Sequence, residues 1–182
     1  MSLTSRPATL DDVPALMEVM RAAIDELQRG LLDDAQIASS HAIMGLDTQL
    51  IEDATYFVVE VDGQVAGCGG WSRRATLYGA DHSAGRDSGM LDPARDPARV
   101  RAMYTHPDFT RRGVGRLILS LCEEAAAAQG FRRLELMSTL AGARLYSAAG
   151  FEPIEHLEDA SGGAAVPLIR MGKEIRAREP AD

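Results

Sequence analysis

The stretch from Val100 to Ala128 joins a strand pattern directly to a helix pattern, and this junction most constrains the fold. Residues 100–105 alternate small or apolar side chains with polar ones and stop at a His-Pro pair, which predicts a strand. Apolar residues then recur at helical spacing, and Gly130 is a natural helix stop, so a helix is predicted over residues 113–129. The sequence T-R-R-G-V-G-R therefore lies between a strand and the N-terminus of a helix.

This junction has the properties of an anion site. The first turn of a helix has unpaired N–H groups and a partial positive charge, and both favour an anion. Gly113 and Gly115 carry no side chain that would block close approach of the backbone. Positive charge is added by Arg111, Arg112 and Arg116. The junction predicts a diphosphate site, and the alternative is a turn with two glycines and three solvated arginines.

Two other nucleotide-binding motifs do not fit the chain. A phosphate-binding loop of the form G-x-x-x-x-G-K-[ST] does not occur in the sequence. The dinucleotide fingerprint G-x-G-x-x-G fails because Ile118 stands where its third glycine belongs. Neither motif therefore accounts for the junction.

Two stretches of the chain resemble motifs of one known family. The sequence M-Y-T-H-P-D-F-T-R-R-G-V-G-R-L-I-L resembles the acetyl-CoA-binding motif of the GNAT N-acetyltransferases, whose core is Q/R-x-x-G-x-G/A after a strand ending in x-P. It departs from that motif at Thr110, where Arg111 and Arg112 offer compensating charge. L-E-L-M-S-T-L-A-G-A-R-L-Y-S-A-A-G-F, residues 134–151, resembles the later strand and short helix of the family. Two motifs in the right order are more specific than either alone.

The resemblance implies an N-acetyltransferase that transfers an acetyl group from acetyl-CoA to a primary amine by direct attack through a ternary complex. It implies acetyl-CoA as cosubstrate. The residues expected to hold the cosubstrate are Met103, Tyr104, Thr105, Arg111, Arg112, Gly113, Val114, Gly115 and Arg116. The main alternative is a regulatory module that binds an acyl-CoA without turnover.

Two residues match the acid and base positions of the family. Tyr146 matches the tyrosine that protonates the leaving thiolate, a task for which a phenol that is protonated at neutral pH is suited. Glu135 matches a carboxylate that some members use as a base, although the connecting loop here is one residue shorter. The alternatives are a tyrosine that packs on the short helix and an ion-paired or solvated strand glutamate. A water chain could replace the base.

The acceptor side of the site is less clearly marked. In the family, the first two helices border the acceptor cleft, so His41, Asp47 and Gln49 are candidates by analogy. Trp71 and Arg73 stand at the end of a strand that approaches the acyl site in related sequences. The alternatives are a core tryptophan and solvated polar residues. The irregular residues 75–98 are an insertion relative to most members, either a lid over the acceptor or a mobile surface loop.

The remaining pattern predicts one mixed α/β (α+β) domain over residues 1–182. The expected helices and strands cover residues 4–6, 10–30, 34–44, 56–61, 65–71, 131–137, 140–149 and 166–173, with a further strand at 151–156 left open. The second hairpin strand follows the Asp62-Gly63 turn, a strong hairpin signal. This order suits a mostly antiparallel central sheet with helices on both faces, which is also the GNAT-like architecture.

The composition limits which binding partners and which cellular compartment we expect. The net charge of −8 argues against sequence-independent binding to nucleic acid and leaves a local basic patch as the alternative. The chain has neither a membrane-length apolar run nor a signal peptide. We therefore expect a cytoplasmic protein without membrane contact, in which Cys68 and Cys122 are reduced core residues and no metal is bound. The acceptor could be a small-molecule amine, an amino sugar, an antibiotic or a protein N-terminus. The resemblance also suggests a homodimer, because many members pair through their C-terminal strands.

Overall fold

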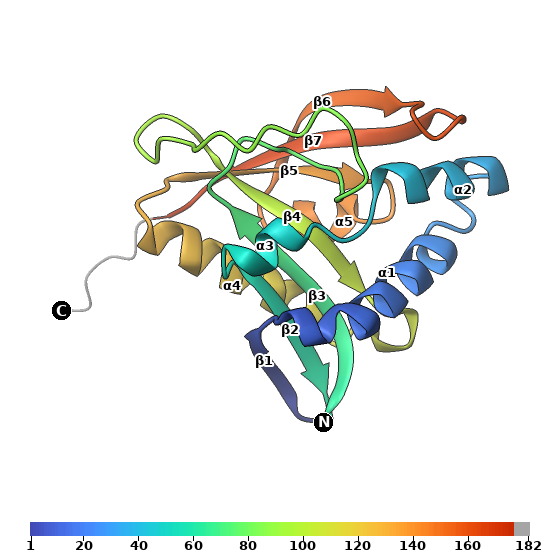
Figure 1. Ribbon diagram of the computed structural model, residues 1–182, viewed down its shortest axis with the longest axis horizontal. Helices are drawn as coiled ribbons and strands as arrows, with labels where there is room; N and C mark the ends of the chain where they lie inside the picture. Colours follow the sequence, from blue (N-terminus) through green and yellow to red (C-terminus); the bar gives the residue numbers. More distant parts are fainter. Residues whose placement is uncertain (177–182) are drawn as a thin grey trace.

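A single sheet of seven strands organises the protein, in the order β1-β2-β3-β4-β5-β7-β6 (Figure 1). The computed structural model describes residues 1–176. The strands are β1 (Leu3–Pro7), β2 (Tyr56–Val61), β3 (Gln64–Ser72), β4 (Ala98–Thr105), β5 (Arg133–Thr139), β6 (Glu152–Asp159) and β7 (Val166–Glu174). All neighbouring strands are antiparallel except β4 and β5, which are parallel. The predicted mixed, mostly antiparallel sheet is confirmed, and residues 152–159 form the strand that the sequence left open.

Helices cover both faces of this sheet (Figure 1). The α-helices are α1 (Val13–Leu27), α2 (Asp34–Ile43), α3 (Thr48–Glu52), α4 (Val114–Ala128) and α5 (Ala143–Ala148). Leu16, Met20 and Ile24 of α1 pack in one core cluster with Val58 and Cys68 of the sheet. The helices α4 and α5 pack on the opposite face, in a second cluster. The two free cysteines are buried, one in each cluster, as predicted.

Close packing on β3 fixes the position of α4. A Cβ atom on Gly67 would lie 2.5 Å from Cγ1 of Val114, and one on Gly69 would lie 2.7 Å from Cγ2 of Ile118. Both distances are too short for real side chains, so α4 can approach β3 only because these positions are glycines. The buried residues of α4 include Val114, Ile118, Cys122 and Ala126, which share one face of the helix.

The strands β4 and β5 diverge almost as soon as they pair. Their register contains only Ala98 opposite Leu134 and Arg99 opposite Glu135. Three residues beyond Arg99, Ala102 adopts a φ of 48°, where β4 also shifts register against β3. The Tyr56 hydroxyl donates a 2.6 Å hydrogen bond to the Ala102 carbonyl, which holds the irregular backbone in place. An opening therefore forms between the central strands.

The segment before the β2–β3 hairpin and the insertion after it complete the sheet face that carries α1. The helix α3 was not predicted, although Asp47 is a typical N-cap, and its side chain accepts a hydrogen bond from the Gln49 backbone N–H. The insertion after β3 is irregular, as predicted, with an isolated bridge between Arg74 and Met90. Backbone hydrogen bonds such as Thr76 N–H to the Asp87 carbonyl at 2.8 Å fold this insertion back on itself.

Candidate active site

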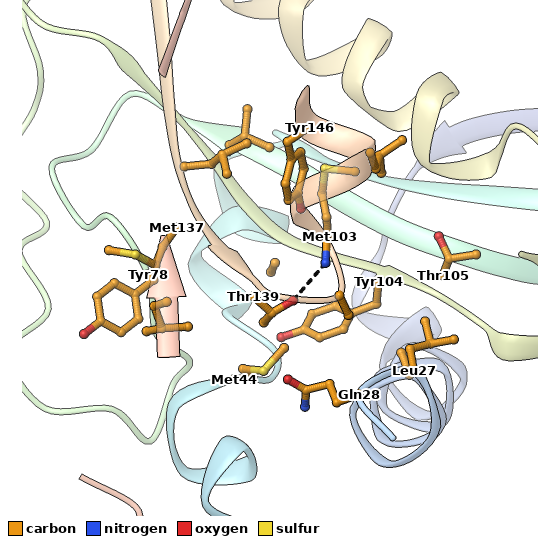
Figure 2. A pocket seen from close by; sticks show the side chains of 18 of the residues that line it. Leu27, Gln28, Met44, Tyr78, Met103, Tyr104, Thr105, Met137, Thr139 and Tyr146 are labelled. Atoms are coloured by element: carbon orange, nitrogen blue, oxygen red, sulfur yellow. Dashed lines mark hydrogen bonds between the residues drawn. The ribbon is translucent and has the colours of Figure 1, made fainter. Parts of the chain in front are cut away.

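A pocket of about 690 Å³ occupies the opening between β4 and β5 (Figure 2). Its lining includes residues 100–105 of β4 and the end of β5. One side is closed by α5 and by the loop before α4, and the other by the ends of α1 and α2 and by residues 77–79 of the insertion. Segments that are distant in the sequence thus meet around one cavity.

The loop before α4 brings positive charge to one end of the pocket. Thr110, Arg111 and Arg116 line the pocket, and both arginines are exposed. Gly113 is the N-cap of α4 with a φ of 85°, in the left-handed region, so the helix begins where the sequence predicted. The free N–H groups of this helix end and the two arginines make this end of the pocket favourable for an anion.

Arg112, Val114 and Gly115 do not line the pocket with their side chains. The Arg112 guanidinium lies 5.3 Å from the centroid of the Phe109 ring, and Val114 is fully buried in the core. A Cβ atom on Gly115 would lie 2.7 Å from Cδ2 of Leu145. The space that Gly115 leaves open is therefore taken by α5, whereas the sequence suggested that it would serve a ligand.

Tyr146 lies on α5 with its hydroxyl turned into the pocket, on the side of Met103 (Figure 2). The side chain is buried, and its ring packs edge-on against Phe151 at a centroid distance of 6.0 Å. Burial raises the pKa of this phenol. Tyr146 therefore stays protonated across the neutral range, as a proton donor must.

Glu135 lies outside this pocket, and its carboxylate accepts hydrogen bonds from two arginines. Its Oε2 accepts hydrogen bonds from Arg99 Nη1 at 2.9 Å and from Arg170 Nη2 at 2.5 Å. The carboxylate is thus held as an ion-paired strand residue, which was the structural alternative to a base. Burial lowers the pKa of Arg99, and the adjacent carboxylate opposes that shift.

Trp71 and Arg73 are also placed away from the pocket. Trp71 is 3% exposed and packs edge-on against Phe131 in the core under α4. The backbone carbonyl of Arg73 accepts a hydrogen bond from Leu91 N–H at 2.7 Å, at the base of the insertion. This geometry supports the interpretation of Trp71 as a core residue.

The candidates chosen by analogy on the acceptor side have structural partners. His41 Nε2 lies 2.7 Å from Asp25 Oδ1, and Gln49 Nε2 donates to Asp53 Oδ1 at 3.1 Å. Neither side chain lines the pocket. Asp47 does not line it either, but it organises the segments that do.

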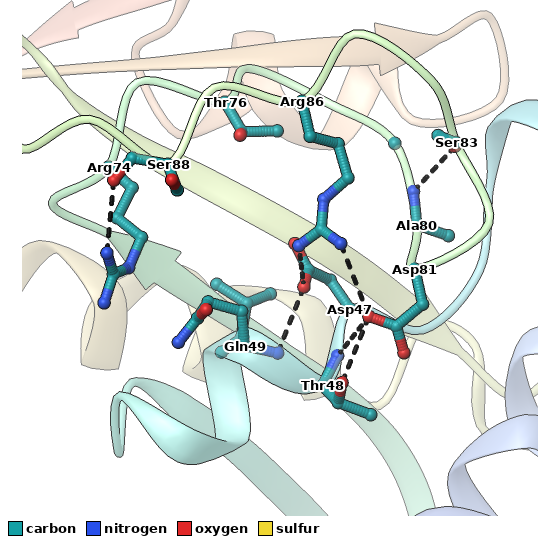
Figure 3. A network of polar contacts seen from close by, with 12 residues as sticks. Asp47, Thr48, Gln49, Arg74, Thr76, Ala80, Asp81, Ser83, Arg86 and Ser88 are labelled. Carbon is teal, nitrogen blue, oxygen red and sulfur yellow. Dashed lines mark hydrogen bonds and ion pairs between the residues drawn. The ribbon is translucent and has the colours of Figure 1, made fainter.

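Asp47 lies beneath the insertion, where it contacts Arg86 (Figure 3), and it also forms a buried ion pair with Arg101. Arg101 Nη2 lies 2.8 Å from Asp47 Oδ2, and both side chains are 2% exposed. Arg86 of the insertion contacts the other carboxylate oxygen at 2.5 Å. Arg101 also donates to the carbonyls of Thr76 at 3.3 Å and Gly79 at 2.9 Å. These contacts hold the segment around residues 77–79 as a wall of the pocket.

The pocket contains one buried polar atom without a hydrogen-bond partner among the residues that the structure describes. It is Oε1 of Gln28, a residue that is 3% exposed and lies at the C-cap of α1. No pattern in the sequence distinguishes this glutamine from a solvated one, because its burial arises from contacts with distant segments.

Two further features are absent from the described residues. Within residues 1–176, no cluster of three or more His, Cys, Asp or Glu side chains could hold a metal ion. None of the helices in the same range combines the length and apolar character needed to cross a membrane.

The fold and pocket define the class of protein, and comparison with known proteins agrees. The family profile described as the acetyltransferase (GNAT) domain matches residues 52–153. None of the curated proteins matches the chain. Because the profile match covers more than half of the chain, the protein belongs to the GNAT acetyltransferase family. The predicted family membership is confirmed.

Solved structures show the same fold at low sequence identity. A GCN5-related N-acetyltransferase from Rhodopseudomonas palustris is 16% identical, with a TM-score of 0.67 and 96% of each chain covered. PaiA N-acetyltransferase from Thermoplasma acidophilum, solved with coenzyme A, is 15% identical, with a TM-score of 0.63 over 96% of this chain and 99% of the other. YncA, a putative acetyltransferase from Salmonella typhimurium solved with acetyl-CoA, is 20% identical, with a TM-score of 0.62 over 100% and 98%.

Proposed function

We propose that this protein is an N-acetyltransferase that transfers the acetyl group of acetyl-CoA to a primary amine, with residues 1–182 acting as one domain. Residues 177–182 lie outside the described part of the chain. The observation that carries the proposal is that one pocket joins an anion-favouring helix end, the free edge of β4 and a buried tyrosine hydroxyl. A thioester cosubstrate and an amine need those features side by side.

The residues around the pocket fit acetyl-CoA. Because β4 loses its parallel partner after Arg99, backbone groups of Met103, Tyr104 and Thr105 on that edge are available to the acetyl and pantetheine part. Arg111 and Arg116, together with the N–H groups that follow Gly113, would hold the diphosphate. The bound thioester would supply the activated acetyl group. The homologous PaiA and YncA structures, which contain coenzyme A and acetyl-CoA, support this assignment.

The chain offers no thiol for a covalent acetyl-enzyme, which favours direct attack by the amine. Its two cysteines, Cys68 and Cys122, are fully buried and do not line the pocket. Burial raises the pKa of the Cys68 thiol to about 12, so it is not a thiolate at neutral pH. The protein would then act by orienting the two substrates in one ternary complex.

Tyr146 is the proposed general acid. Its buried, protonated hydroxyl reaches the pocket from α5 and would donate a proton to the sulfur of the leaving group. The amine must lose a proton as well, and Glu135 is engaged with Arg99 and Arg170 outside the pocket. We therefore assign removal of the amine proton to water in the pocket and to no side chain of the enzyme.

Release of coenzyme A in the presence of amines tests this function. The full chain would be incubated with acetyl-CoA and a panel of small amines, amino sugars and peptides with free N-termini. Thiol release would be followed optically, and the amine product would be identified by the mass of one added acetyl group. We expect amine-dependent release with at least one class. Tight binding of coenzyme A by calorimetry without any acetylated product would instead support the regulatory module.

A further inference from the structure

We infer that the acceptor is an amine with an apolar, uncharged body, and that the carbonyl oxygen of Gln28 binds its amino group. This inference rests on the proposed function and adds the substrate class. Three independent features of the pocket carry it: the apolar wall, the charge of the lining, and the unpartnered oxygen of Gln28.

The part of the pocket away from the α4 N-terminus is lined mainly by apolar side chains. They come from the ends of α1 and α2, from the insertion and from β5 and β7, and they include Leu27, Met44, Leu77, Met137 and Leu168. Leu31, which is 53% exposed, lies on the same lining and extends the apolar surface toward solvent. A hydrocarbon body would bind favourably here because its apolar surface would be removed from water.

The lining lacks negative charge although the chain is acidic. The protein has 27 aspartate and glutamate residues and a net charge of −8. Among the described residues that line the pocket, none is an aspartate or a glutamate. The one arginine on the β4 wall, Arg101, is already paired with Asp47. A second ammonium group on the acceptor would therefore be desolvated without a counter-ion, which costs several kcal/mol.

Gln28 presents a hydrogen-bond acceptor that the protein leaves unused. Its Nε2 donates to the Ile24 carbonyl at 3.2 Å, which fixes the orientation of the amide, because the reverse orientation would bring two oxygens together. The remaining atom, Oε1, is buried and has no partner among the described residues. In Figure 2 this oxygen is turned toward the part of the pocket where Met44 and Tyr104 lie. An unpaired buried acceptor is unfavourable, and an N–H group of the bound amine would satisfy it.

A matched pair of amines tests the inference. Hexylamine and hexamethylenediamine have the same hydrocarbon chain, but the diamine carries a second ammonium group at the far end. Binding of each would be measured by calorimetry on the full chain saturated with coenzyme A, and acetylation would be measured in parallel with acetyl-CoA. We expect hexylamine to bind at least about tenfold more tightly than the diamine, because the second charge has no partner.

Substitution of Gln28 separates its role from that of the apolar wall. Gln28→Met keeps the size of the side chain but removes the acceptor, so hexylamine should bind about fivefold or more weakly while the affinity for coenzyme A is unchanged. Gln28→Glu supplies a carboxylate and should shift the preference toward the diamine. Gln64→Glu adds the same charge at an exposed position of β3 and should leave the preference as it is.

Three outcomes would overturn the inference: a diamine that binds as well as hexylamine, no measurable binding of either amine, or a folded Gln28→Met protein with unchanged hexylamine affinity. Selective hexylamine binding without acetylation of any amine in the panel would support the binding preference of the pocket and reject the proposed function. The two claims therefore fail separately.

Discussion

The two ends of the pocket differ in how they are built. The end at α4 comes from one continuous stretch, in which Thr110, Arg111, Gly113 and Arg116 lie within a single loop and helix start. The opposite end is assembled from α1, α2, the insertion, β5 and β7. It depends on a buried ion pair between Asp47 and Arg101, which are 54 positions apart.

This difference separates binding of the cosubstrate's diphosphate from recognition of the acceptor amine. A helix N-terminus binds an anion through backbone groups, so a short motif is enough to form that half of the site. Recognition of the acceptor needs side chains from several segments in a fixed arrangement, and here a buried network holds them.

The largest expected effect concerns Tyr146, whose hydroxyl is turned into the pocket. Tyr146→Phe removes the proposed proton donor with little change in volume, so kcat should fall by about 10²–10⁴-fold while the affinity for coenzyme A is retained. Because burial raises the pKa of this phenol above its ordinary 10.0, kcat of the wild type should show no alkaline loss from this group below about pH 10. Steady-state kinetics over pH would measure both.

Tyr78→Phe is the matched control for that prediction. Tyr78 also lines the pocket, but its hydroxyl donates to Asp159 Oδ2 at 2.8 Å, and burial raises its pKa to about 12. Its loss should leave kcat within about threefold, far below the effect of a positioned acid. Equal losses in the two variants would return Tyr146 to a packing role.

The next effect is on the stability of the acceptor half. Asp47→Asn keeps the size and the capping ability of the side chain but leaves Arg101 buried without a counter-ion, which should lower the free energy of unfolding by about 3–5 kcal/mol. Asp81→Asn removes an exposed partner of Arg86 and should cost less than about 1 kcal/mol. Urea denaturation would measure both values. Equal stability of the two variants would show that the buried pair does not hold the insertion.

A smaller effect distinguishes the two glycines of the motif. Gly115→Ala should cost about 1–3 kcal/mol and lower kcat, because the new methyl group displaces Leu145, the neighbour of Tyr146. Gly113→Ala has open space but a left-handed φ, so about 1–2 kcal/mol of strain is expected without displacement of α5. Thermal unfolding together with kcat would separate the two cases, and an unchanged kcat in folded Gly115→Ala would contradict this account.

The same contrast decides how much could be predicted from the sequence. The strand, loop and helix around Gly113 and the hairpin at Asp62 were predictable, because local periodicity and turn residues specify them. A core Trp71 and an ion-paired Glu135 were among the alternatives, but the sequence could not decide between them and a site role, because each placement depends on which distant segments pack nearby. The oxygen of Gln28 lacks a partner because the side chain is buried by distant segments, and no local sequence pattern predicts that burial.

The division of the pocket into two halves is tested most directly by two-substrate kinetics on one variant from each half. Arg116→Ala removes an exposed charge at the α4 end and should raise KM for acetyl-CoA by about fivefold with little change for the amine. Leu77→Ala removes apolar contact at the insertion and should raise KM for the amine by about fivefold with little change for acetyl-CoA. If either substitution changes both constants equally, the two ends of the pocket do not act as separate binding sites.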